Sequence, residues 1–150
     1  MFVPVRESPA GAVLDRGIAL FVVLAAAAMV WMLSSAQPDA RGYGTHEQLG
    51  MSPCSWPRAV GAPCPTCGVT TAATRLIHLD PLGALEAQPF GAALAVVGLA
   101  LAALALWSLV RGGSFLLALT LLPYGSILRG LLVLLLGSWL YKYLTFSPPT

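Results

Sequence analysis

The sequence predicts an all-α membrane protein with about three transmembrane helices and a Cys/Pro/Gly-rich extramembrane loop that carries one or two short helices. Hydrophobic residues make up 57% of the 150 residues and charged residues only 9%, whereas soluble domains carry about 25% charged residues. Three apolar stretches occupy most of the chain, and all three cysteines fall in the long segment between the first two. We therefore expect residues 1–150 to form a single membrane domain.

A helix needs roughly 20 residues to cross a bilayer, and this length indicates which parts of the three apolar stretches can be spans. The first span is expected over residues 17–34 and the second over residues 90–110, both without a charge in their apolar runs. The third is expected over residues 114–136, with a helical extension to about residue 144, although Pro123 interrupts it. A multi-pass arrangement follows from these lengths.

The residues beside the spans predict an orientation. Arg16 and Arg111 adjoin the first two spans and lie on the same side of a three-span protein. Because basic residues next to spans favour the cytoplasm, the cysteine loop is expected on the external face. Residues 1–16 are expected to form a short tail. An alternative interpretation is that the first apolar run belongs to a signal peptide cut after Ala36.

The loop over residues 35–89 contains seven prolines and six glycines, a density that excludes long helices from most of it. Residues 69–79 are the exception, because they lack both residue types and their apolar side chains recur at helical spacing. Asp80 and Pro81 end this helix. A second short helix is expected over residues 82–87.

The cysteines of this loop allow several chemical interpretations, which the sequence leaves open. A disulfide between Cys54 and either Cys64 or Cys67 would close a loop of about a dozen residues and stabilise the fold by about 3 kcal/mol. Three free thiols that only pack against their neighbours are a further possibility.

A metal site is the second interpretation. Zinc takes four ligands, usually from cysteine and histidine. Cys54, Cys64 and Cys67 would supply three of them, His46 is the nearest candidate for the fourth, and His78 is the next. Zinc is the only cofactor that this pattern suggests.

Redox catalysis is the third interpretation. Cys64 and Cys67 directly precede a predicted helix, whose N-terminal dipole lowers the pKa of a nearby thiol and makes the thiolate more reactive. The chain has no βαβ pattern, so a thioredoxin-like fold is excluded.

The stretch "GAPCPTCGVTTA", with Cys54 upstream and "LIHLDPLGALEAQPF" downstream, resembles the family catalogued as domain of unknown function 2752, whose members are small bacterial membrane proteins with a C-P-x-C-G core. The resemblance covers roughly residues 49–132 and implies a bacterial inner (cytoplasmic) membrane. Thr71 stands where the family usually has arginine, and Gln88 stands where it usually has asparagine. The resemblance implies no activity.

Arg129 is a charge inside the third apolar stretch. A charge at the centre of a spanning helix costs at least about 3 kcal/mol, so it is expected to find a partner. We expect it to tie the last helix to the loop through Asp80, Glu86 or backbone carbonyls. The alternative is that its side chain snorkels to the interface.

The functional expectation follows from these features together. Phosphate loops, zinc-protease motifs and serine-hydrolase motifs are missing, and a net charge of +2 with scattered basic residues predicts no nucleic-acid partner. We expect an accessory or assembly subunit of a larger membrane complex, in contact with lipid and other membrane subunits, and not an enzyme. The alternative is a membrane thiol–disulfide oxidoreductase or a metal-handling protein that uses Cys64 and Cys67.

Overall fold

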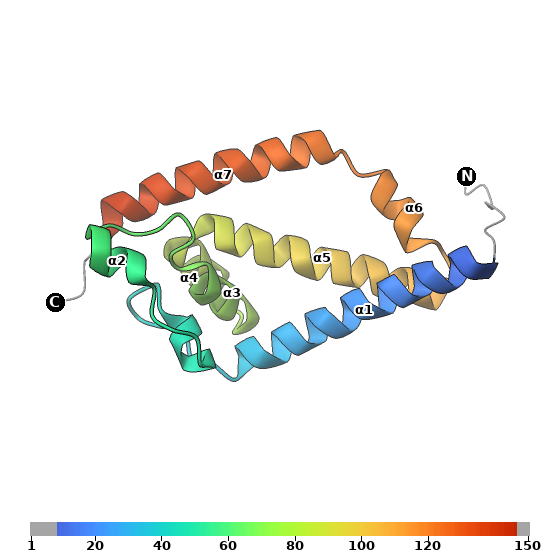
Figure 1. The fold of residues 1–150 in the computed structure, drawn as a ribbon, viewed down its shortest axis with the longest axis horizontal. Coiled ribbons are helices and arrows are strands. Elements are labelled where there is room, and N and C mark those ends of the chain that lie inside the picture. Colours follow the sequence, from blue (N-terminus) through green and yellow to red (C-terminus); the bar gives the residue numbers. More distant parts are fainter. Residues whose placement is uncertain (1–8, 147–150) are drawn as a thin grey trace. The chain divides into compact units, whose positions relative to one another are not determined.

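The structure is a computed structural model that describes residues 9–146, and over these residues it is all-helical without strands. Three of its helices are long and apolar enough to cross a membrane, and the cysteine-containing segment lies between the first two of them. The predicted fold class is therefore confirmed. Figure 1 shows the elements, which are α1 (Pro9–Ser34), the 3₁₀ helix η1 (Thr45–Leu49), α2 (Ser55–Val60), α3 (Val69–Ile77), α4 (Pro81–Ala87), α5 (Pro89–Arg111), α6 (Phe115–Thr120) and α7 (Tyr124–Thr145).

Two helix boundaries differ from those expected. Helix α1 begins at Pro9, within the stretch that was expected to be a tail. Proline fits the first turn of a helix because the N–H group that it lacks has no intrahelical partner there. Residues 1–8 of that tail lie outside the described residues. The third apolar stretch is divided into α6 and α7, because Pro123 interrupts the helix and becomes the N-cap of α7.

The described residues form two compact units, of which the first combines residues 9–28 with 98–122. Its core holds Ala19, Ala105 and Phe115. Buried Asp15 on α1 accepts hydrogen bonds from the backbone N–H groups of Phe115 at 3.1 Å and Leu116 at 2.7 Å. Asp15 thereby satisfies N–H groups that the first turn of α6 leaves without an intrahelical partner.

The second unit combines residues 29–97 with the described residues from 123 onward, and it holds all three cysteines. Its core consists of small side chains, which allow helices to approach closely. α3 and α4 lie side by side in it (Figure 1). A Cβ atom on Gly91 of α5 would come within 2.7 Å of the Val69 Cα atom. The buried core residues are Ala72, Ala84, Ala87 and Ala92, with Leu76 packed against them.

Both short helices expected in the loop are confirmed as α3 and α4. The chain reverses between them at Leu79, whose φ of 62° lies in the left-handed region. Asp80 then caps α4, because its Oδ1 atom accepts a hydrogen bond from the Gly83 N–H at 2.8 Å. The helices η1 and α2 are too short for the sequence pattern to have indicated them.

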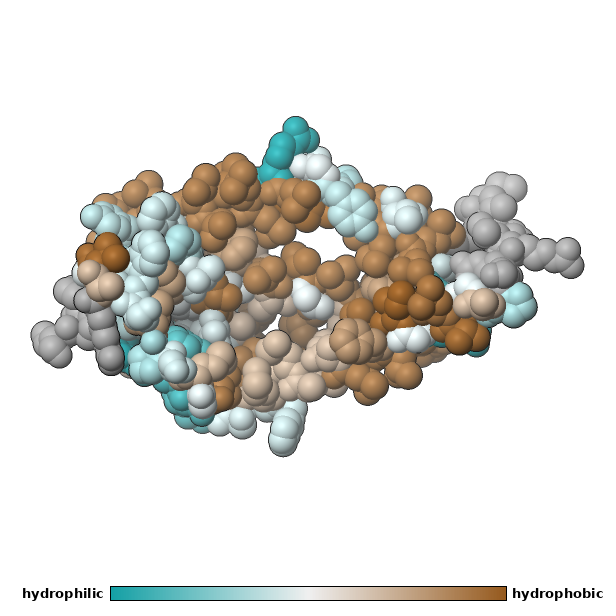
Figure 2. Space-filling view, viewed as in Figure 1, coloured by the Kyte–Doolittle hydropathy of each residue, from teal (hydrophilic) through white to brown (hydrophobic). Residues whose placement is uncertain are grey.

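Large apolar side chains are exposed along much of α7, and Figure 2 shows a mostly hydrophobic surface over this helix. Leu128, Leu132, Val133, Leu136 and Leu140 are all more than half exposed. Soluble proteins rarely leave so continuous an apolar surface uncovered. The exposure agrees with a bilayer environment.

Candidate functional site

The structure brings the three cysteine sulfurs together in the second unit. The Cys64 and Cys67 Sγ atoms are 3.0 Å apart, and the Cys54 Sγ atom lies 3.9 Å from that of Cys64. All three sulfurs lie within 4.8 Å of one another. The cysteines are free in this structure, so a disulfide between any two stays a prediction.

A tight turn places the sulfurs of Cys64 and Cys67 on the same side of the chain. The Cys67 N–H donates to the Cys64 carbonyl at 3.0 Å, and the Cys64 N–H donates to the Cys67 Sγ atom at 3.2 Å. Gly68 follows with a φ of 95° and forms the N-cap of α3. A side chain there would be strained and would come within 2.5 Å of the Gly42 carbonyl oxygen. This turn therefore requires the glycine that follows the second cysteine.

Burial and hydrogen bonding shift the pKa values of the two thiols of the turn in opposite directions. Desolvation raises the pKa of the Cys64 thiol, but hydrogen bonds from Cys67, Thr66 and Cys54 outweigh this effect and leave its pKa below the ordinary value. Burial raises the pKa of the Cys67 thiol, and its hydrogen bond to Cys64 raises it further. Cys64 is therefore the first of the pair to become a thiolate.

Two side chains from other elements hold the prolines on either side of Cys64. The Trp139 indole on α7 donates to the Pro63 carbonyl at 3.1 Å, and the Gln88 amide donates to the Pro65 carbonyl at 3.1 Å. Gln88 is fully buried, so its amide is desolvated and its one bond to the turn is well shielded from water. The sequence analysis gave no sign that Trp139 contacts the cysteine loop, and it noted Gln88 only as a departure from a family pattern.

Lys142 on α7 is a further contact that sequence reasoning missed. Its buried Nζ atom donates to the carbonyl oxygens of Gly42 and Ala87, both at 3.1 Å. The sequence shows only a lysine near the end of an apolar helix, and the side chain of such a lysine usually extends to the membrane interface.

A pocket of about 410 Å³ lies beside the sulfurs and is lined by all three cysteines. His46, Met51 and Glu47 line the same pocket. It therefore places an imidazole, a thioether and a carboxylate around one space together with the thiols.

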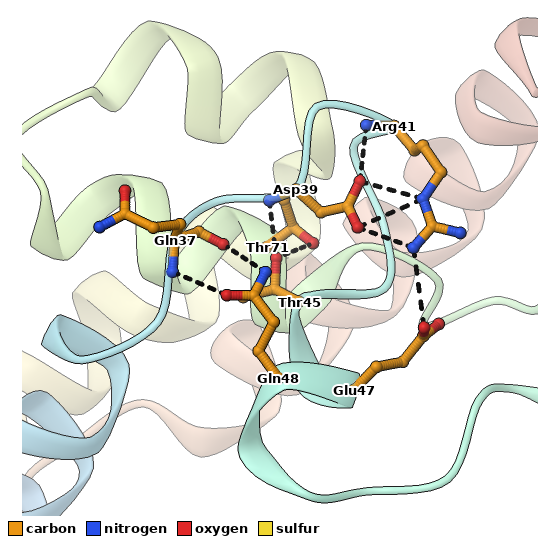
Figure 3. A network of polar contacts seen from close by, with 7 residues as sticks. All are labelled: Gln37, Asp39, Arg41, Thr45, Glu47, Gln48 and Thr71. Atoms are coloured by element: carbon orange, nitrogen blue, oxygen red, sulfur yellow. Dashed lines mark hydrogen bonds and ion pairs between the residues drawn. The ribbon is translucent and has the colours of Figure 1, made fainter.

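Figure 3 shows the polar network that holds the segment before the cysteines in place. Arg41 donates to the Asp39 carboxylate from its backbone N–H at 2.8 Å and from its Nη2 atom at 2.7 Å. The hydrogen bond from the Arg41 side chain lowers the pKa of Asp39. Buried Thr45 and Thr71 hydroxyls lie 2.8 Å apart and join η1 to α3. Thr71 thus has a structural partner at the position where the resembled family usually has arginine.

Neither histidine joins the sulfurs. His46 lines the pocket, but among the described residues the group of close metal-ligating atoms contains only cysteine sulfurs. His78 is hydrogen-bonded through its Nε2 atom to the Ala36 carbonyl at 3.0 Å, which makes Nε2 the donor. A Cys₃His zinc site would therefore need His46 to move.

The structure gives Arg129 different contacts from those expected. Its Nε atom donates to the Gly125 carbonyl of its own helix at 3.0 Å, and the side chain is exposed. Asp80 instead forms an ion pair with Arg75 at 3.5 Å. Glu86 contributes its carbonyl oxygen, which accepts from the Tyr141 hydroxyl at 3.1 Å. In the described residues Arg129 forms no bond to Asp80 or Glu86, so the expected tie is not seen there, and Arg129 lies near the start of α7.

Comparison with known families gives one match. Residues 54–102 match the model of the family described as Protein of unknown function (DUF2752), which supports the resemblance noted in the sequence. The matched stretch contains all three cysteines and Gln88, but it contains neither His46 nor Lys142. No curated protein and no solved structure matches the chain.

Proposed function

We propose that the protein is an accessory or assembly subunit of a membrane complex whose external loop is built around one thiophilic metal ion held by Cys54, Cys64 and Cys67. One observation carries the metal proposal, namely that three sulfurs lie within 4.8 Å of one another. Thiolates are soft ligands that favour ions such as zinc and monovalent copper. The ion would join segments of a loop that has a core of only small side chains.

The distances fit a metal ion in part. Sulfurs that each lie about 2.3 Å from one zinc ion are roughly 3.5–4 Å apart. The Cys54–Cys64 separation of 3.9 Å meets this value, whereas the Cys64–Cys67 separation of 3.0 Å would need to widen by a change in side-chain rotamer. For zinc, the fourth ligand would come from the pocket, where His46 is available.

Two features of the chain support the accessory role. The loop between the first two long helices carries the metal candidate, and the long helices expose apolar side chains to lipid or to other subunits. Gly98 on α5 has open space where a side chain would stand, and small residues of this kind allow helices of different subunits to approach closely. We place the protein in the bacterial inner membrane with the cysteine loop outside.

Metal analysis of the purified chain tests the metal proposal. Protein purified in mild detergent under reducing conditions should contain one metal ion per chain, and the bound ion should protect the thiols from alkylation. Cys54→Ser, Cys64→Ser and Cys67→Ser should each lose the ion, whereas Ser52→Ala, which changes an exposed neighbour, should retain it. Metal-free protein with three freely alkylated thiols would contradict the proposal.

Two further experiments test location and partners. A membrane-impermeant thiol reagent should label the metal-depleted, reduced protein in intact spheroplasts, and labelling only after permeabilisation would indicate the inverted orientation. An affinity-tagged chain should retain a stoichiometric membrane partner in mild detergent. A chain that elutes alone, at the mass of one copy plus detergent, would contradict the accessory role.

Thiol–disulfide exchange is the second candidate, favoured by the 3.0 Å separation of Cys64 and Cys67. The Cys64 thiolate would attack a protein disulfide and form a mixed disulfide. Cys67 would lose its proton and attack the Cys64 sulfur, which leaves a Cys64–Cys67 disulfide and a substrate reduced by two electrons to its dithiol. This reaction does not need Cys54. Disulfide exchange that survives in Cys54→Ser, with no metal bound to the wild type, would select this candidate.

A further inference from the structure

The ligand set around the candidate metal site has three members. In the part of the chain that the structure describes, the close ligand atoms are the sulfurs of Cys54, Cys64 and Cys67, with no fourth cysteine, histidine or carboxylate among them. Structural zinc sites are almost always four-coordinate and closed. Monovalent copper is a softer ion that accepts three thiolates without a fourth ligand. The number of ligands therefore favours copper over zinc.

We propose that the ion is Cu(I), bound by these three thiolates, and that it enters and leaves through the pocket. This inference rests on the metal site of the proposed function. The pocket that the cysteines line is also lined by His46 and Met51. Imidazole and thioether groups are both ligands for copper, and a thioether selects Cu(I) over harder ions. The pocket therefore offers two weaker ligands beside the three strong ones.

The arrangement fits transfer of copper to or from a partner protein that presents thiolate or thioether ligands. Met51 is 48% exposed, so an incoming ligand can reach it. The ion would pass between sulfur ligands by exchange, one bond forming as another breaks. Its oxidation state does not change, and no electron acceptor is required.

Competition titrations of the full chain in detergent test the choice of ion. Metal-free, reduced protein is titrated anaerobically with Cu(I) against a chromophoric Cu(I) chelator, and separately with Zn(II). We expect one Cu(I) per chain that a tenfold excess of Zn(II) does not displace, and an X-ray absorption spectrum with three sulfur neighbours. Cys54→Ser should weaken Cu(I) binding by about 100-fold or more, since loss of an outer-shell partner alone costs 10–100-fold.

The exchange route is tested by the rate at which bound Cu(I) passes to the chelator. Met51→Leu should slow this transfer several-fold, whereas Met29→Leu, which removes an exposed thioether on α1, should leave the rate unchanged. Equal rates in the two variants would overturn the exchange route. Tighter binding of zinc, with a nitrogen neighbour lost in His46→Gln, would overturn the copper assignment and leave the metal site intact. If neither ion binds, the proposed metal function itself fails.

Discussion

Replacement of Lys142 by methionine tests how strongly the last helix holds the cysteine loop. Methionine keeps most of the aliphatic stem and removes an ammonium that is only 6% exposed and bonds two carbonyl oxygens at 3.1 Å. Each buried carbonyl left without a partner costs about 1–3 kcal/mol. Removal of a desolvated charge offsets part of this loss. We therefore expect a net loss of about 2–3 kcal/mol in the free energy of unfolding.

Thermal unfolding in detergent, followed by tryptophan fluorescence, measures this loss. For a chain of this length, 1 kcal/mol corresponds to about 2–4 °C, so Lys142→Met should lower the midpoint by about 5–10 °C. Arg129→Leu is the matched control on the same helix, because Arg129 is exposed and its side-chain hydrogen bonds stay within α7. It should change stability by less than about 0.5 kcal/mol. Equal midpoints for wild type and Lys142→Met, or an equal loss in Arg129→Leu, would refute the reasoning.

Three further predictions concern the surroundings of the site. Gly68→Ala should destabilise the protein by more than Gly61→Ala, as measured by chemical denaturation of both variants. Both glycines have positive φ, and an alanine in this left-handed conformation costs about 1–2 kcal/mol. Only Gly68 also lies close to a carbonyl oxygen, which a side chain there would meet. Asp39 has a folded-state pKa below its ordinary 3.8, so its bond to Arg41 stabilises the fold above that value and is lost as the pH falls through the folded-state pKa. The Asp39→Asn variant should therefore show a smaller decline in melting temperature below pH 3.8 than the wild type, and parallel declines would contradict this. Trp139→Phe removes one hydrogen bond to the turn and should lower stability by about 1 kcal/mol, with a matching increase in the rate of thiol alkylation; an unchanged rate would show that the turn does not depend on that bond.

The sequence by itself determined the fold class and the local helices. The length of an apolar run and the lack of charge decide whether a helix can cross a bilayer, and both can be read along the chain. The helices α3 and α4 were predictable for a similar reason, because their start and end depend on proline, glycine and apolar spacing within a few residues. The turn from Cys64 to Cys67 is also local, because only two residues separate these cysteines in the sequence.

The division of the third apolar stretch was only partly predictable. Pro123 marked the interruption, but proline inside an apolar helix can produce either a kink or a complete break. The structure contains a break, because α6 ends at Thr120 and α7 begins at Tyr124.

Tertiary structure alone decided which distant residues complete the site. Cys54 lies beside Cys64 although the two are ten positions apart in the chain, and Trp139 and Lys142 reach the cysteine loop from the last helix. Both α7 side chains bond to backbone carbonyls. Every residue carries a backbone carbonyl group, so the sequence does not indicate which carbonyl will accept a given hydrogen bond. Only the packing of the helices determines which carbonyl a donor contacts.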